Sequence, residues 1–190
     1  GLLTKKDYAN INWGGDAAKV DYGTLYEKRF TVLRKAYHNF MRQRPVPGYD
    51  TPYPDDWYRF QFLSSDWLPD YCLYMAIKED NGMVDWQQWP RALRVREPEA
   101  MARFRAEHAE EIEFWAFLQY EFDRQWRSLH AYAKSKGIAI MGDIPIYVSP
   151  DSSDLWTHPE LFQTDGQVHL TQVAGCPPDA FAADGQLWGN

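Results

Sequence analysis

Apolar residues recur with helical spacing in two stretches of the first half of the chain. In the first stretch, Thr24 and Glu27 match the capping box that opens many helices, and the apolar positions continue to about residue 41. In the second stretch, apolar residues share one helical face from Leu68 onward and stop before Asn81-Gly82, a pair typical of a helix end. The pattern therefore predicts two amphipathic helices.

A third and longer periodic stretch begins at Pro98, which suits the first position of a helix, and ends at Gly137. An apolar run follows over 138–148, and only Gly142, Asp143 and Pro145 interrupt it. A helix, a glycine and a buried strand in this order form half of a βαβ unit, in which ligands bind beyond the C-terminal ends of strands. The helix carries one apolar stripe that is expected to pack: Trp115, Leu118, Phe122, Trp126, Leu129 and Ala133.

Turn-forming residues mark the connections between these segments. Four of the twelve prolines lie between residues 44 and 56, which predicts an exposed connection without regular structure. Two tryptophans and a proline over 86–90 predict a compact turn, and Asp165-Gly166 between short alternating runs predicts a hairpin. The pair Pro177-Pro178 stiffens a predicted loop over 176–183.

Length and charge restrict the class of protein. With 190 residues the chain is long enough for one sizeable core and short for two independent domains. Its 20 Lys and Arg against 27 Asp and Glu give a formal charge of -7. That balance argues against nucleic acid or an anionic membrane as the main partner, and it favours a neutral substrate.

Other classes of protein and site are disfavoured by what the sequence contains. No apolar stretch approaches the roughly 20 residues of a membrane span, and no signal peptide is visible, so a cytoplasmic protein is expected. Cys72 and Cys176 lie far apart and are expected to be plain thiols. The five histidines form no i, i+4 pair and no cluster with cysteine, so a metal site is not expected. The apolar start at Gly1 and the end at Asn190 without a polar tail are expected of a piece of a longer protein.

Asp143 is the first candidate for function, because it places a carboxylate inside the predicted buried strand. Charging a carboxylate away from water costs several kcal/mol unless the charge is paired or solvated. The alternative is a structural carboxylate that holds backbone amides or an arginine, and the sequence leaves these two roles about equally open.

The remaining candidates also have a structural alternative. Asp151 and Asp154 could face a sugar, although capping of a short helix is the commoner use of such residues. Asp179 could make a turn, but the two prolines before it favour a loop that is ordered over a ligand. Nine Trp and twelve Tyr are many for this length, and flat rings suit the faces of pyranoses. The rings beside the acidic residues are the better stacking candidates: Tyr147, Trp156 and Trp188.

Several motifs resemble those of the 4-alpha-glucanotransferases, also called amylomaltases or disproportionating enzymes (glycoside hydrolase family 77). In the last third of the chain these are GDIPIYV (142–148), DSSDLW (151–156), VAGCPPD (173–179) and GQLWGN (185–190). Upstream they are VDYG (20–23), WLPDY (67–71), WQQWP (86–90) and FLQYEF (117–122). The resemblance covers nearly the whole chain, with small departures at Cys176 and Ala180.

The resemblance implies an α/β fold, as a piece of the (β/α)8 barrel of the alpha-amylase clan. Residues 1–98 would belong to a helical inserted subdomain, and 99–190 would hold the long helix, one barrel strand over 138–148 and active-site loops. Asp143 would be the aspartate of the clan's first conserved region on the third barrel strand, and the loop over 175–181 would border the acceptor side of the site. The inserted subdomain would be mostly helical.

The implied activity of the parent enzyme is retaining transfer of alpha-1,4-glucan segments between maltooligosaccharides or starch-derived glucans. No catalytic residue is expected within this chain, because the family's nucleophile and acid/base residue are expected beyond Asn190. The chain alone is therefore expected to be inactive. The expected substrate-binding residues are Asp143, Tyr147, Asp151, Asp179 and Trp188. The resemblance implies no metal or organic cofactor and no nucleic acid or membrane partner.

Two other functions remain open from the sequence. A noncatalytic helical domain could bind carbohydrate or protein through its aromatic residues, and a hydrolase of the same clan would differ only in using water as the acceptor. If the strand over 138–148 lacks neighbouring strands, its exposed edges are also expected to promote self-association of the chain.

Overall fold

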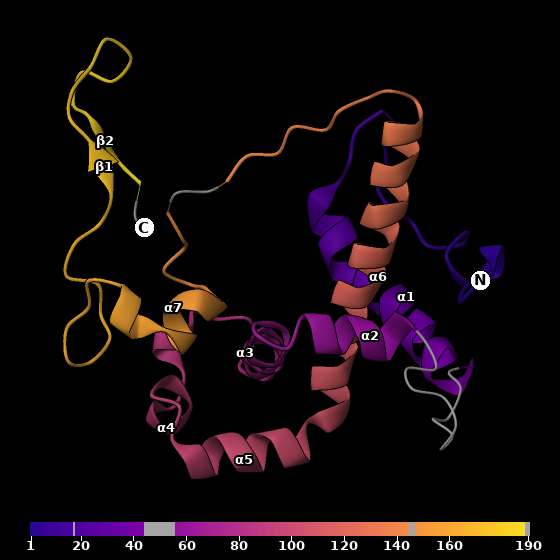
Figure 1. The fold of residues 1–190 in the computed structure, drawn as a ribbon, viewed down its shortest axis with the longest axis horizontal. Helices are drawn as coiled ribbons and strands as arrows, with labels where there is room; N and C mark the ends of the chain where they lie inside the picture. The colour runs from indigo at the N-terminus through magenta and orange to yellow at the C-terminus, as the bar shows by residue number, and fades with distance from the viewer. Residues whose placement is uncertain (17, 44–55, 145–146, 189–190) are drawn as a thin grey trace.

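Helix α6 (Ala109–Ser135) is the support against which the other large helices pack (Figure 1). The structure is a computed structural model that describes residues 1–16, 18–43, 56–144 and 147–188. Helices α1 (Tyr22–Gln43), α2 (Asp56–Leu63), α3 (Leu68–Asp80) and α5 (Pro98–Glu107) all contact α6. The described part of the chain is therefore mostly helical.

Helix α1 begins two residues before the predicted capping residue. Its start is capped by Asp21, whose carboxylate accepts the backbone N–H of Thr24 at 2.9 Å and the Thr24 hydroxyl at 2.8 Å. Thr24 and Glu27 thus lie within the helix, and the predicted capping box is wrong. The helix itself is confirmed, because an aspartate satisfies the first free N–H groups as well as a threonine does.

Helix α3 follows the prediction closely. It runs from Leu68 to Asp80, stops at the expected Asn81-Gly82 pair, and Gly82 adopts a positive φ of 70°. The residue just after the C-cap of such a helix end takes this left-handed conformation, which glycine adopts without steric cost. The helix buries most of its length, including Cys72, Leu73 and Ile77, so it forms the centre of the core.

The predicted long helix from Pro98 is two helices. Pro98 occupies the start of α5, as expected, but α5 ends at Glu107 and α6 starts at Ala109. His108 lies between them with φ -120° and ψ 32°, although neither glycine nor proline marks this point. Because of the break, α5 buries Met101 and Phe104 while α6 runs in another direction through the core (Figure 1). Tertiary packing therefore determines the position of the break.

The apolar stripe of α6 packs in only part of its length. Trp115 is buried and Leu118 packs against the core, but Phe122, Trp126 and Leu129 are 65%, 44% and 54% exposed. The prediction that Phe122 and Trp126 are packing residues is therefore wrong for this structure. Ala133, the last residue of the stripe, is buried at 8% exposure, so the stripe is open to solvent in its middle and buried again near its end.

The core is built largely from aromatic rings and spans the expected division at residue 98. One group of rings joins α1, α2 and α6: Tyr37, Phe40, Trp57, Phe117 and Tyr120. A second group joins α3, the turn at η2 (Trp86–Gln88) and helix α7 (Ser153–Thr157): Tyr74, Trp89 and Trp156. Residues from both sides of position 98 thus share one hydrophobic core.

The predicted buried strand is exposed and extended here. Gly137, with φ 72°, ends α6 as expected, but no residue of 138–144 or 147–148 belongs to a strand. Ile138, Met141 and Ile144 are 61%, 95% and 84% exposed, and Pro145 lies outside the described residues. A strand is buried only when neighbouring strands and helices cover it, and the described residues supply none beside this segment (Figure 1). The prolines between 44 and 55 also lie outside the described residues.

The C-terminal part contains two turns. The predicted hairpin at Asp165-Gly166 is confirmed by the antiparallel bridge between Thr164 and Leu170, and the short helix η3 (Pro159–Leu161) precedes it. Strands β1 (Gly175–Cys176) and β2 (Gln186–Leu187) then pair antiparallel, with Gly175 opposite Leu187. The predicted proline-stiffened loop forms the tip of this second hairpin.

The smaller helices connect these parts. The short helix η1 (Lys5–Asp7) precedes α1, and α4 (Arg91–Arg94) follows η2, where the predicted compact turn over 86–90 is confirmed. Across the described ranges, no helix has both the length and the apolar character that a membrane crossing requires.

Candidate functional site

The five predicted site residues lie on two segments, the connection from α6 to α7 and the β1–β2 hairpin with the residue that follows it. Asp143 and Tyr147 belong to the extended connection between α6 and α7, and Asp151 lies just before α7. Asp179 lies in the loop between β1 and β2, and Trp188 follows β2. The structure brings only some of these side chains into contact.

Tyr147 and Trp188 form an aromatic pair. Their ring centroids are 5.6 Å apart with an angle of 52° between the planes, and the residues are 47% and 48% exposed. The backbone N–H of Trp188 donates to Ala174 at 2.9 Å, and its indole Nε1 donates to the Gln186 side chain at 2.9 Å. The β1–β2 hairpin thus orients an aromatic surface that remains open to solvent, and such surfaces stack on the apolar faces of sugars.

Asp143 is exposed, so the burial argument that singled it out does not apply in this structure. Its carboxylate accepts the backbone N–H of Ile144 at 2.9 Å. An exposed carboxylate is stabilised by water and requires no partner charge. What remains of the prediction is its place four residues before Tyr147, on the same connection.

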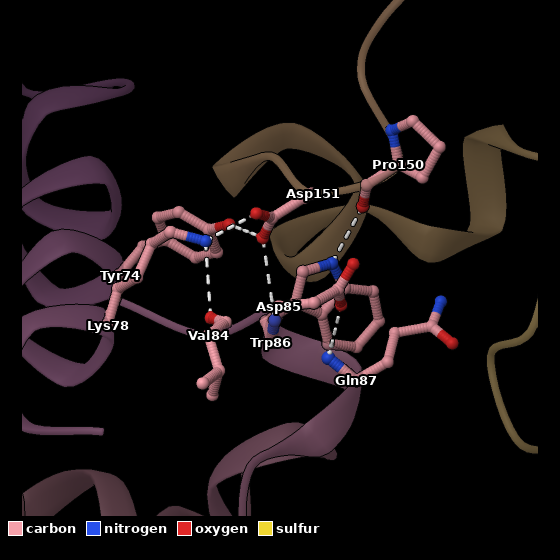
Figure 2. Close-up of polar contacts among 8 residues, drawn as sticks. All are labelled: Tyr74, Lys78, Val84, Asp85, Trp86, Gln87, Pro150 and Asp151. Carbon is pink, nitrogen blue, oxygen red and sulfur yellow. Dashed lines mark hydrogen bonds and ion pairs between the residues drawn. The ribbon is translucent and has the colours of Figure 1, made fainter. Parts of the chain in front are cut away.

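Asp151 is the best connected of the predicted residues, but its contacts are with the protein (Figure 2). One carboxylate oxygen accepts the Tyr74 hydroxyl at 2.6 Å and the Trp86 backbone N–H at 3.4 Å. The other oxygen forms an ion pair with the ammonium group of Lys78. Both oxygens therefore face α3 and η2, which assigns Asp151 the role of holding its segment against the helical core.

The charges of this cluster stabilise one another. Burial alone would raise the pKa of Asp151, but hydrogen bonds from Lys78 and Tyr74 and the positive charge of Lys78 hold that pKa below its ordinary value. Burial, followed by the hydrogen bond to Asp151, raises the pKa of Tyr74, which keeps its hydroxyl a donor. The ionised carboxylate and the neutral phenol are thus both favoured.

A second anchor lies beside the first. Trp86 is fully buried and its indole Nε1 donates to the backbone oxygen of Pro150 at 2.7 Å (Figure 2). Asp85 holds the turn that presents this tryptophan, because its carboxylate accepts the backbone N–H of Gln87 at 2.8 Å. Lys78 additionally donates to the backbone oxygen of Val84 at 3.2 Å. The two consecutive residues Pro150 and Asp151 are therefore both fixed to the core.

Sequence reasoning missed Lys78, Tyr74 and Trp86 as partners of this segment. A signal was present, since Lys78 lies one helical turn after Tyr74 on a helix whose other core-facing positions are apolar. A lysine in a buried stripe requires a carboxylate or carbonyl partner. The pattern does not reveal that this partner is Asp151, far away in the sequence.

The predicted roles of the neighbouring residues require two corrections. Ser152, and neither Asp151 nor Asp154, caps α7, because its hydroxyl accepts the backbone N–H of Leu155 at 3.3 Å. Trp156 is buried rather than available for stacking, and its indole Nε1 donates to Leu93 at 3.0 Å. Its ring packs in the core because α7 is amphipathic and turns this face inward.

Asp179 makes the turn that was its structural alternative. Its carboxylate accepts the backbone N–H groups of Phe181 at 2.8 Å and Ala182 at 2.7 Å, and its own N–H donates to the Ala182 oxygen at 3.0 Å. These bonds shape the loop tip, where Phe181 is 97% exposed. One oxygen of the carboxylate, Oδ1, accepts both bonds and thus fixes the shape of the loop.

Among the five predicted residues, Tyr147 and Trp188 form an exposed aromatic pair, and Asp143 precedes this pair on the same segment as Tyr147. Asp151 and Asp179 hold the two backbone segments that carry the pair. Within the described ranges, no three metal-ligating side chains gather at one point.

Comparison with known proteins identifies the family. A family model described as 4-alpha-glucanotransferase matches residues 1–190. A 4-alpha-glucanotransferase of Clostridium butyricum is 40% identical over 100% of this chain and 37% of its own length, and one of Thermus thermophilus is 39% identical over 99% and 37%. The chain thus spans about 37% of the length of these curated relatives.

The structural comparison agrees. An amylomaltase from Streptococcus agalactiae, solved in complex with acarbose, superposes with a TM-score of 0.89 and 42% identity over 100% of this chain and 37% of that protein. This similarity confirms the expected fold class, a mostly helical piece of an alpha-amylase-type (β/α)8 enzyme.

Proposed function

The chain belongs to the 4-alpha-glucanotransferase family, and on that premise we propose that it supplies part of the glucan-binding surface of an enzyme that transfers alpha-1,4-glucan segments between maltooligosaccharides. The observation that carries the proposal is the Tyr147–Trp188 pair, which is half exposed and oriented by a hairpin. A pyranose ring presents an apolar face of matching shape, and stacking on such a pair removes both surfaces from water.

Each predicted residue has a distinct role in this proposal. Tyr147 and Trp188 stack on the sugar, and the exposed carboxylate of Asp143 accepts hydrogen bonds from sugar hydroxyls near the bond that is cleaved. Asp151 and Asp179 act indirectly, because their carboxylates are bonded to the protein and hold the two segments that carry the binding residues.

The proposed reaction is a double displacement with retention. One carboxylate attacks the anomeric carbon while a second carboxyl group protonates the glycosidic oxygen of the leaving sugar, so that the glycosidic bond breaks. The second group then takes the proton from an acceptor hydroxyl, which displaces the enzyme carboxylate and forms the new glycosidic bond. Retention needs two carboxyl groups about 5 to 5.5 Å apart. We assign neither of them to this chain, and the longer relatives have room for both in the part of their length that the chain does not span.

The test compares two proteins on maltotriose. The product of the complete gene is expected to release glucose and to form longer maltooligosaccharides, whereas the 190-residue chain alone is expected to form neither. Release of glucose by the purified 190-residue chain would overturn the assignment of the reacting carboxylates to other parts of the protein.

Product analysis also separates the transferase from a hydrolase of the same clan. A transferase conserves the number of glycosidic bonds, while a hydrolase increases the reducing ends with time. Inactivity of the complete gene product on all maltooligosaccharides, with binding retained, would favour a noncatalytic carbohydrate-binding role. A cytoplasmic location is part of the proposal, and fractionation of cells that carry the gene tests it.

A further inference from the structure

A groove between α3 and α7 lies outside the surface assigned above. It has a volume of about 540 Å³, within the range of small-ligand sites. Trp67 and Tyr71 form its aromatic side at the start of α3, and Ser153, Asp154 and Thr157 form its other side on α7. These two elements are held together by the Asp151 cluster, so the groove is a fixed feature of the core rather than a space beside a free loop.

The aromatic side of the groove is exposed and supported. Trp67 is 43% exposed, although it directly precedes a helix that is otherwise mostly buried. Its ring meets the ring of Tyr71 edge-on, with centroids 6.0 Å apart and 63° between the planes. Tyr71 is fixed in turn, because its hydroxyl accepts the side-chain N–H of Gln119 on α6 at 3.1 Å. The indole of Trp67 is thus a supported flat surface.

The polar side of the groove combines hydroxyl groups with two open carboxylates. Of the four aspartates along it, Asp70 is bonded to Arg96 at 2.7 Å and Asp151 is paired with Lys78. Arg96 and Lys78 thus match the charges of these two carboxylates within the protein. Asp66 and Asp154 are exposed and flank the groove as hydrogen-bond acceptors.

This chemistry selects the class of ligand. Exposed carboxylates repel phosphate and other anions, and they accept hydrogen bonds from neutral hydroxyl groups. A supported indole between such acceptors suits a neutral sugar, whose hydroxyls point outward from an apolar ring face. We propose that the groove between α3 and α7 is an auxiliary binding site for a neutral glucan chain, separate from the Tyr147–Trp188 surface. This inference rests on the proposed function only for the choice of glucan as the ligand.

The experiment follows the indole N–H signals of the ¹⁵N-labelled 190-residue chain by NMR during titration with maltopentaose. The Trp67 signal is identified by its loss in Trp67→Ala. This signal is expected to shift during the titration and to reach a plateau. In Trp67→Ala, the shifts of the backbone amide signals of α7, across the groove, are expected to need about fivefold more maltopentaose. Trp126→Ala is the matched control, because Trp126 is 44% exposed on α6 and lies outside the groove.

A conservative variant keeps the test valid if Trp67→Ala alters the fold. Asp154→Asn preserves the shape of the groove. It is expected to raise the concentration of maltopentaose that saturates the Trp67 shift and to leave the unfolding midpoint nearly unchanged. The inference is overturned if the Trp67 signal does not shift at a saturating concentration of maltopentaose. It is also overturned if the wild type and Asp154→Asn need the same concentration of maltopentaose for this shift.

The same spectra separate this inference from the proposed function. Movement of the Trp188 signal without movement of Trp67 supports the proposed surface and overturns the groove. Movement of Trp67 alone supports the groove and counts against the Tyr147–Trp188 surface. If neither signal moves, both are overturned.

Discussion

The ammonium group of Lys78 on α3 forms an ion pair with the carboxylate of Asp151, which precedes α7 (Figure 2). The two side chains are 11% and 33% exposed, so the positive charge is the more deeply buried member. This contact connects the helical core with the segment that carries Asp143 and Tyr147. Loss of the pair is therefore expected to affect both stability and the position of the binding surface.

Removal of the carboxylate is expected to cost more than removal of the ammonium group. Asp151→Asn leaves the buried charge of Lys78 without its partner and is expected to lower the free energy of unfolding by about 2 to 3 kcal/mol. Lys78→Met keeps the aliphatic volume and leaves a carboxylate that water and Tyr74 still stabilise, for a loss of about 1 kcal/mol. Urea unfolding followed by tryptophan fluorescence measures both. Equal losses of unfolding free energy in the two variants would contradict the prediction that removal of the carboxylate costs more.

Stability is expected to fall on acidification through the same pair. The folded state lowers the pKa of Asp151 from its ordinary value of 3.8, so the folded carboxylate remains charged at pH values where the unfolded one is protonated. The contribution of the Asp151 carboxylate to the free energy of unfolding is complete above pH 3.8. It is lost as the pH falls through the lower pKa of the folded state. The difference in urea midpoint between the wild type and Asp151→Asn should narrow over this range. A constant difference would exclude Asp151 as its source.

Trp188→Ala is expected to weaken the binding of maltopentaose by about fivefold, because it removes one ring of the exposed pair. Trp126→Ala removes an equally accessible ring from the far part of α6 and is expected to leave the affinity unchanged. Isothermal titration at one pH and salt concentration compares them. If both variants bind as the wild type does, stacking on Trp188 does not contribute to the affinity.

The two cysteines are expected to differ sharply in reactivity. Cys72 is 1% exposed, and burial raises the pKa of its thiol to about 12, whereas Cys176 is partly exposed at the β1–β2 hairpin. A thiol reagent at mildly alkaline pH should label Cys176 in the folded chain and Cys72 only after denaturant is added. Cys176→Ser should abolish the fast reaction. Labelling of Cys72 at the same rate without denaturant would show that α3 opens readily.

Self-association is expected through the extended segment after α6. Ile138, Met141 and Ile144 are exposed there, next to backbone groups that are not paired in a described strand. Sedimentation velocity should show concentration-dependent association, and Met141→Lys should reduce it while Lys134→Glu, a charge change on nearby α6, should not. A monodisperse monomer at all concentrations would contradict this prediction.

Some features of the chain follow from local chemistry and were predictable. The end of α3 at Asn81-Gly82, the start of α5 at Pro98 and the turn at Asp165-Gly166 depend on residues that favour one backbone conformation over the others. The motifs around Asp143 and Trp188 likewise pointed to the family, which the comparisons then identified. These are properties of neighbouring residues, and the sequence by itself determined them.

The tertiary structure alone decided which side chains meet. Asp151 was a predicted substrate-binding residue, and the fold brings its carboxylate to Lys78. Trp156 was a predicted stacking residue, and the fold buries it beside Tyr74. Phe122 and the segment over 138–144 have core-like sequences and yet lie exposed. Burial depends on the elements that pack against a residue, and those elements are brought together by contacts between distant parts of the chain. Local patterns carry the preference for a helix or a strand, while only the assembled fold supplies the surfaces that cover it.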